Sequence, residues 1–365
     1  GLLTNEVPRR FRFLVPEVVG SIPSCAFFLS ISALSNNQIH IIPIITMYTL
    51  YIFIKVIKNL MSYTFLESNE KPIQRMDWEN YHRLNVIHNF MDELECTYPS
   101  ICTVGLIGAS LEGRDLKILK ISNSVASNAA VWMDAGIHAR EWIAPAVNTY
   151  IKYRQPVNYH GYFLPVVNPD GYEYSHTVNR MWRKNRAWHG GQCLGVDLNR
   201  NFSYGWGGSG SSDNPKHAFY RGPEPFSEPE SSAMRVHYIH KKYGISFKVY
   251  ITLHSYGQII LFPFAFRDEL CPDYVTLLEG AATIYETNGN TYKVGISRDV
   301  MYGAAGTSND WSYGAAGIPY CYLIELRSKK HKFKLPKEEI QETGNEILNS
   351  VMALQCLTPS STFWV

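Results

Sequence analysis

The chain has 365 residues, 45% of them apolar and 18% charged, and its formal net charge is +2. This composition is that of a folded globular protein, and the length suits one large domain plus an additional segment. The small net charge and the scattered basic residues give no support for nucleic-acid binding. The seven cysteines include no CxxC pair, which argues against a thiolate zinc site, and their odd number leaves free thiols and a disulfide framework both open.

Residues 1–70 differ in character from the rest of the chain. Three arginines near the start are followed by two apolar stretches, 25–34 and 41–54. The second is shorter than the about 20 apolar residues that a membrane-spanning helix needs. A signal-peptide core, a membrane anchor over 25–57 and a truncated or mis-joined N-terminus are therefore all open interpretations, and no function is drawn from this segment.

From about Met76 onward, hydrophobic periodicity predicts alternating strands and helices. Strands are predicted at 102–107, 116–122, 130–134, 162–167, 247–253, 259–262 and 320–326. Helices are predicted at 78–95, 142–153, 228–243, 272–288 and 337–356, and a turn at Asn168–Gly171. The turn formers Glu112-Gly-Arg114 join the first two strands into a hairpin. The alternation predicts an α/β domain over 75–360, with a mixed, mostly parallel twisted sheet of about eight strands flanked by helices on both faces.

A candidate metal site lies where one predicted strand ends and a helix begins. His138 and Glu141 are three residues apart in the segment Asp134-Ala-Gly-Ile-His-Ala-Arg-Glu-Trp142, so at a helix start both side chains can reach one ion. His254 ends another predicted strand and can supply the third protein ligand that a catalytic zinc requires. Taken singly, each residue has an ordinary alternative: a surface ion pair at a helix start, or a buried histidine with satisfied hydrogen bonds. Their shared place at strand ends favours the metal site.

Seven blocks then carry a specific resemblance. They are Gly136-Ile-His-Ala-Arg-Glu-Trp142, Asn168-Pro-Asp-Gly-Tyr172, Asn179-Arg-Met-Trp-Arg-Lys184, Gly195-Val-Asp-Leu-Asn-Arg-Asn-Phe202, Leu253-His-Ser-Tyr256, Tyr302-Gly-Ala-Ala-Gly306 with Asp310-Trp311, and Ile324-Glu-Leu-Arg327. In this order, across about 75–360, the chain resembles the zinc metallocarboxypeptidases of the pancreatic A/B type. The resemblance implies hydrolysis of the C-terminal peptide bond of peptides and proteins. It also implies one zinc ion per chain, held by His138, Glu141 and His254.

The resemblance assigns catalytic roles to three further residues. Glu325 is the implied general base, which accepts a proton from the water that zinc activates and passes it to the leaving amine. A carboxylate at the end of an apolar strand is costly unless paired or catalytic, so Glu325 is informative without the resemblance as well. Arg183 is implied to polarise the scissile carbonyl and Asp197 to orient a ligand histidine. A solvated arginine in a basic run and a surface aspartate are the ordinary alternatives.

The resemblance also assigns the binding of the peptide terminus. Arg200 with Asn199 matches a clamp for the free carboxylate, which a planar guanidinium pairs well. The remaining implied substrate-binding residues are Arg140, Tyr256, Tyr302 and Asn309. Tyr302 matches a mobile tyrosine that closes over the terminal residue, and Asn309 matches the floor of the side-chain pocket. Because Asn309 carries no charge, we expect an A-like preference for neutral terminal side chains.

Three features depart from the family pattern. The connection at 154–161 is shorter than the resemblance implies, so we expect exposed apolar surface where a helical segment is missing. Lys216 follows Pro215 where a disulfide partner of Cys193 is expected, and residues 1–70 show no activation segment. These departures leave two alternatives to an active enzyme: a relative that binds peptide C-termini without turnover, and a membrane-tethered protein. The resemblance favours a secreted enzyme, and we expect a monomer.

Overall fold

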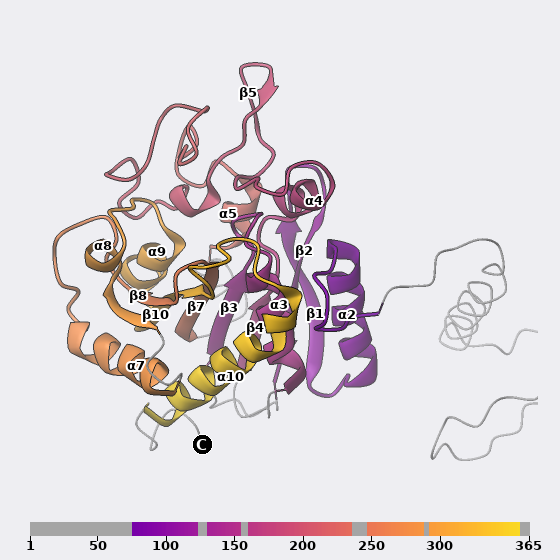
Figure 1. Ribbon diagram of the computed structural model, residues 1–365. Helices are drawn as coiled ribbons and strands as arrows, with labels where there is room; N and C mark the ends of the chain where they lie inside the picture. Colours follow the sequence, from indigo (N-terminus) through magenta and orange to yellow (C-terminus); the bar gives the residue numbers. More distant parts are fainter. Residues whose placement is uncertain (1–74, 123–129, 155–159, 236–246, 288–291, 358–365) are drawn as a thin grey trace, which may run out of the picture. The chain divides into compact units, whose positions relative to one another are not determined.

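The computed structural model describes residues 75–122, 130–154, 160–235, 247–287 and 292–357 (Figure 1). All of them belong to one compact unit, Pro72–Val365. The predictions for residues 1–70 lie outside these ranges, and the short connection at 154–161 lies partly outside them. Within these ranges no helix has a stretch long and apolar enough to cross a membrane.

An eight-stranded mixed sheet forms the centre of the described part of the chain. Its spatial order is β1 (Cys102–Ala109), β2 (Asp115–Ile121), β4 (His160–Leu164), β3 (Ala130–Ala135), β7 (Phe247–Ser255), β10 (Tyr320–Leu326), β8 (Ile259–Phe262) and β9 (Lys293–Ile296). Strands β4, β3, β7 and β10 are parallel, as is the β8–β9 pair, whereas β1 and β2 form the predicted antiparallel hairpin. The mixed, mostly parallel sheet is therefore confirmed.

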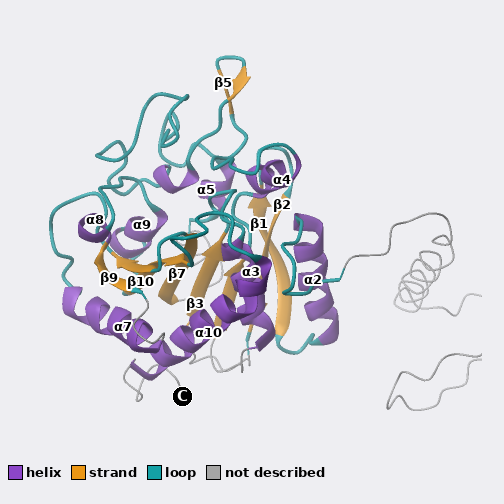
Figure 2. Ribbon diagram, viewed as in Figure 1, coloured by secondary structure: helices purple, strands orange, loops and turns teal. Residues whose placement is uncertain are grey.

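Helices cover both faces of this sheet, as predicted (Figure 2). The principal helices are α2 (Leu84–Thr97), α3 (Ile143–Arg154), α4 (Pro169–Thr177), α5 (Pro229–Ala233), α7 (Tyr274–Thr287), α8 (Ser297–Val300), α9 (Ser308–Gly314) and α10 (Ile340–Leu357). Strand β3 shows why both faces need covering. Its Val131 and Met133 belong to the core beneath α2, α3, α7 and α10, whereas Trp132 belongs to the opposite core, which includes Trp311 of α9. A strand buried on both sides reads as a continuous apolar run, as this one does.

Several elements differ from the predictions. Helix α2 begins at Leu84, and a 3₁₀ turn at Lys337–Glu339 precedes α10. The turn predicted at Asn168–Gly171 opens α4 instead: the Asn168 side chain accepts a hydrogen bond from Gly171 N at 2.9 Å, and Pro169 occupies the first helical position. Asparagine and proline favour turns and helix starts alike, so the sequence signal was ambiguous. Strand β9, helices α8 and α9, and the short β5 (Trp188–His189) and β6 (Gln192–Cys193) hairpin were not predicted.

Cys96, Cys193, Cys271 and Cys321 have free thiols in the described part of the chain. The thiol of Cys193 donates to Arg186 O at 3.0 Å. The residues around Pro215 provide no thiol for it, so in the described ranges this region is held by hydrogen bonds instead. Lys184 contributes, because its ammonium donates to the carbonyls of Pro215 and His217.

Gly136 turns the chain from β3 towards the metal-binding segment, and it has a positive φ of 65°. A Cβ at this position would lie 3.0 Å from Pro145 Cγ and 3.2 Å from Pro165 O. We expect G136A to lower the free energy of unfolding by about 2–4 kcal/mol, from left-handed strain plus close contact. The matched control is G113A, where φ is 81° and a Cβ meets nothing within 4 Å. Chemical denaturation should show a loss of only about 1 kcal/mol there; equal losses would contradict this account of Gly136.

Candidate metal centre and active site

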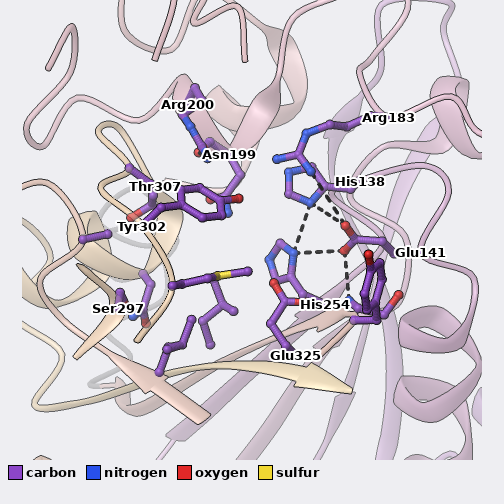
Figure 3. A pocket seen from close by; sticks show the side chains of 18 of the residues that line it. His138, Glu141, Arg183, Asn199, Arg200, His254, Ser297, Tyr302, Thr307 and Glu325 are labelled. Atoms are coloured by element: carbon purple, nitrogen blue, oxygen red, sulfur yellow. Dashed lines mark hydrogen bonds and ion pairs between the residues drawn. The ribbon is translucent and has the colours of Figure 1, made fainter. Parts of the chain in front are cut away.

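Two neighbouring parallel strands bring the predicted metal ligands together. His138 follows β3, Glu141 lies just before α3, and His254 is near the end of β7. Ala135 of β3 is paired with Leu253 of β7, so the chain carries His138 and His254 to the same edge of the sheet. All three side chains are buried and point towards one another (Figure 3).

The ligand atoms converge on one point. His138 Nδ1 lies 3.0 Å from Glu141 Oε1, and His254 Nδ1 lies 3.0 Å from Glu141 Oε2. The two Nδ1 atoms are 3.1 Å apart. Two nitrogens bound to one tetrahedral zinc ion, at about 2.0–2.1 Å each, lie about 3.4 Å apart. The spacing therefore fits a shared small cation.

The chemistry of the three side chains also suits a cation. Asp197 Oδ1 lies 3.1 Å from His138 Nε2, so this nitrogen donates and Nδ1 carries the free lone pair. Burial, together with Arg183, lowers the pKa of His138. Burial acts to raise the pKa of Glu141, but its contacts with His138 and His254 outweigh burial and hold that pKa below its ordinary value. Two imidazole rings and one carboxylate are a ligand set that suits zinc.

Asp197 supports more than the ligand histidine. Its Oδ2 accepts from Arg183 Nε at 3.0 Å and Nη2 at 2.9 Å, and its Oδ1 accepts from Asn199 N at 3.1 Å. Burial acts to raise the pKa of Asp197, but Arg183 and His138 hold it well below its ordinary value. Arg183 in turn places Nη1 3.9 Å from Glu141 Oε1. One buried carboxylate therefore positions both a metal ligand and a guanidinium beside the metal site.

Glu325 lies near the end of β10 and pairs in register with His254 of β7. It is buried, and its Oε2 has no hydrogen-bond partner in the part of the chain that the structure describes. Burial and the charge of Glu141 raise the pKa of Glu325 well above its ordinary value, against a smaller opposing effect of Arg183. A carboxyl group with an unpaired buried oxygen is available to exchange protons with a molecule in the cavity.

A cavity of about 280 Å³ opens beside these groups. Among the predicted site residues, those that line it are His138, Arg140, Glu141, Arg183, Asn199, Arg200, His254, Tyr256, Tyr302, Asn309 and Glu325. Asp197 is not part of the lining; it contacts His138 and Arg183 as described above. Every residue predicted for the site is therefore brought to one place.

Asn199 and Arg200 lie across the cavity from Glu141 (Figure 3). Arg200 is buried, with Nε donating to Gly210 O at 2.8 Å and Nη1 to Asn199 O at 2.7 Å. Asn199 Oδ1 accepts from Ser308 N at 2.9 Å, which fixes the amide so that its NH₂ group is the free end. Two donors, held by backbone contacts, therefore face the cavity opposite the metal ligands.

Sequence reasoning missed much of the cavity wall. The lining residues not predicted include Phe219, Leu261, Ser297, Met301, Thr307, Leu323 and Phe333. The ring of Phe219 lies 5.0 Å from the guanidinium of Arg200 and 5.3 Å from that of Arg183. Apolar side chains in loops and strands carry no spacing signal that separates a cavity wall from a core.

Comparisons with known proteins agree with this geometry. Residues 87–350 match the zinc carboxypeptidase family. Carboxypeptidase B of Astacus astacus is 40% identical over 293 residues, covering 76% of this chain and 96% of that protein. Carboxypeptidase A2 of Rattus norvegicus is 38% identical over 289 residues, covering 74% and 68%.

Solved structures show the same fold. Bovine thrombin-activatable fibrinolysis inhibitor, in complex with tick carboxypeptidase inhibitor, has a TM-score of 0.70 and 36% identity, covering 76% of this chain and 97% of that one. Carboxypeptidase A from Helicoverpa armigera has a TM-score of 0.72 and 29% identity, covering 84% and 80%. Fold and site thus define a zinc hydrolase. The chain belongs to the zinc carboxypeptidase family and is a metallocarboxypeptidase whose zinc site is His138, Glu141 and His254.

Metal content tests the ligand set directly. We expect about one zinc per wild-type chain after dialysis against buffer, and almost none in H254A, because a catalytic site with three protein ligands loses one. D197N should keep the ligands but weaken zinc binding by about 10–100-fold, because it removes the anionic partner of His138. Mass spectrometry of metals and competition with a chelator measure both, with Y302F as the control that keeps full zinc. Stoichiometric zinc in H254A would contradict the assignment.

Proposed function

We propose that this metallocarboxypeptidase is a secreted, monomeric exopeptidase that removes single residues with neutral side chains from peptide and protein C-termini. The observation that carries the proposal is the pair Asn199 and Arg200, fixed across the cavity from the metal ligands. Secretion, the monomeric state and the division into an N-terminal segment 1–70 and a catalytic domain 75–360 rest on the family resemblance.

An exopeptidase must recognise a free terminal carboxylate. The guanidinium of Arg200 and the NH₂ group of Asn199 are donors suited to its two oxygens. Arg200 is held by two backbone carbonyls, so little side-chain entropy is lost when it binds a carboxylate. Tyr302, which is 44% exposed and stacked on Phe219 with ring centroids 6.2 Å apart, stands at the edge of the cavity and can cover the bound residue.

The scissile bond then lies between this clamp and the metal ligands. When bound, zinc supplies a Lewis acid that polarises a carbonyl and lowers the pKa of a water molecule. Glu325, with its unpaired Oε2, accepts a proton from the attacking water and donates it to the leaving amine. Arg183, fixed by Asp197, donates to the carbonyl oxygen as negative charge develops there. Arg140 and Tyr256 contact the residues on the other side of the bond.

The pocket for the terminal side chain is neutral. Its walls include Leu261, Met301 and Leu323, and its floor is Asn309, which is 1% exposed. Neither Oδ1 nor Nδ2 of Asn309 has a hydrogen-bond partner in the described ranges. An uncharged amide cannot compensate the desolvation of a lysine or arginine side chain. It can hydrogen-bond a neutral polar side chain, so apolar, aromatic and neutral polar termini are all compatible with this pocket.

The catalytic role of Glu325 is tested by E325Q. We expect kcat to fall by about 10²–10⁴-fold, the range of a general acid–base contribution, while zinc content stays at the wild-type level. Release of C-terminal residues from a blocked dipeptide, with and without chelator, measures the activity. Wild-type protein with full zinc and no release would instead support the alternative of a relative that binds termini without turnover.

The specificity assignment is tested at Asn309. We expect wild-type kcat/KM to be higher for peptides ending in Phe, Leu or Gln than for those ending in Lys. N309D should raise kcat/KM for Lys and Arg termini by at least about 10-fold, because a buried carboxylate pairs their charge. The control N309L has a side chain branched at the same atom but without polar groups, and it should favour only apolar termini. A strong wild-type preference for Lys would overturn the assignment.

A further inference from the structure

A strongly cationic loop borders the cavity. The segment 327–337, between β10 and α10, contains six lysines and arginines and no carboxylate, although the whole chain has a net charge of only +2. Arg327 is neutralised by Glu339, Glu342 and Glu346 of the following turn and helix. Lys337 donates to Asn80 Oδ1. The four remaining cations are exposed, and none has an ion-pair partner in the part of the chain that the structure describes: Lys329, Lys330, Lys332 and Lys334.

This lysine loop, residues 328–334, is held in a defined conformation. The amide of Lys332 donates to Ser328 O at 2.8 Å, and that of Lys334 donates to His331 O at 3.0 Å. The guanidinium of Arg180 also donates to the carbonyl of Phe333. Lys332 itself has a φ of 53°, a left-handed conformation that glycine or asparagine adopts more easily than lysine. The loop therefore presents its lysines on a backbone that these hydrogen bonds hold in place.

The loop also forms one wall of the cavity. Phe333 lines the cavity, its ring contacts that of Tyr256 at 4.9 Å, and the guanidinium of Arg140 lies 4.0 Å from its centroid. The argument rests here on the proposed function: with the terminal carboxylate at Arg200, the upstream residues of a peptide leave along the opposite wall. That path passes Phe333, and Lys332 and Lys334 are its immediate neighbours in the chain.

We infer that the lysine loop recognises acidic side chains of peptide substrates, shortly upstream of the bond that is cut. Exposed lysines attract carboxylates weakly one at a time, by a factor of about 1.4–5 per pair, but several act together at the mouth of one cavity. Their effect is screened by salt, with a Debye length of about 10 Å at 0.1 M. Such contacts at the rim raise the association rate and lower KM, and they leave the chemical step unchanged.

A lipid surface with anionic headgroups offers the same chemistry, since clusters of lysines also bind acidic membranes. The place of Phe333 inside the cavity favours the peptide, because it fixes the loop on the route of the substrate rather than on a separate face. The experiment therefore includes an arm for vesicles.

The test uses the full chain with zinc bound and three peptides of equal length that end in the same neutral residue. Upstream they carry two glutamates, two glutamines or two lysines. We expect kcat/KM for the glutamate peptide to exceed that for the glutamine peptide by about 5–20-fold at low salt, mainly through KM. The advantage should fall to less than about 2-fold at 0.5 M NaCl. The lysine peptide should be the poorest substrate.

Charge-reversal variants test whether Lys332 and Lys334 cause the preference for acidic peptides. K332E combined with K334E should abolish or invert the preference, with kcat for the glutamine peptide and zinc content unchanged. The control is K293E, which makes the charge change of one such substitution at an exposed lysine of the edge strand β9 and is matched to the single variants K332E and K334E. It should keep the wild-type preference. Should the double variant fail to fold, the single variants and the salt dependence of the wild-type protein still decide the outcome.

The experiment distinguishes a failure of the lysine-loop inference from a failure of the proposed function. Equal kcat/KM for the three peptides, or a preference unaffected by salt and by K332E/K334E, would overturn the inference while leaving the exopeptidase intact. Hydrolysis of none of them would overturn the proposed function itself. Binding to phosphatidylserine vesicles that is lost in K332E/K334E, without any dependence on peptide charge, would assign the loop to a lipid surface and overturn the peptide proposal.

Discussion

The rest of the site depends on one electrostatic constraint: two imidazoles and a carboxylate meet in a buried position with their ligand atoms 3.0–3.1 Å apart. Free lone pairs at this spacing repel one another, and burial removes the water that would screen them. A cation resolves the conflict, so metal binding and folding are coupled here. The parallel pairing of β3 with β7 places His138 and His254 at the same edge of the sheet, so the strand pairing itself brings the ligands together.

Asp197 connects the metal ligands to neighbouring residues of the site. It is the common partner of His138, Arg183 and the backbone of Asn199, so a metal ligand and the residues to which we assign the carbonyl oxygen and the peptide terminus share one buried anion. Buried charges are tolerated when each has close partners, and this arrangement supplies them. Under the proposed function it also makes the three roles interdependent. A change at Asp197 would disturb zinc affinity and carbonyl binding together, whereas a change at Arg200 would disturb only the binding of the peptide terminus.

The sequence predicted those features of the fold and the site that depend on local patterns of apolar and polar residues. Runs of apolar residues located seven of the eight strands of the central sheet, and β10 was predicted with its observed bounds. His254 could be proposed as a ligand because it ends such a run. The missed strand β9 is only four residues long, too short for periodicity to register. Phe219 and Phe333 could not be foreseen either, because their place in the cavity wall follows from the three-dimensional path of loops. The lysine loop was also missed, because the basic residues were interpreted as scattered, and its meaning depends on Phe333 lining the cavity.

The two proposals divide selectivity between two chemically different regions. The pocket around Asn309 is buried and uncharged, so it would discriminate by shape and hydrogen bonding at short range. The lysine loop is exposed and charged, so it would act at longer range and be sensitive to salt. A charge inside the pocket would need its own desolvation compensated with every substrate, whereas exposed lysines keep most of their hydration and cost little. With the charge at the rim and a neutral amide in the pocket, the proposed arrangement would attract acidic peptides without accepting charged terminal side chains.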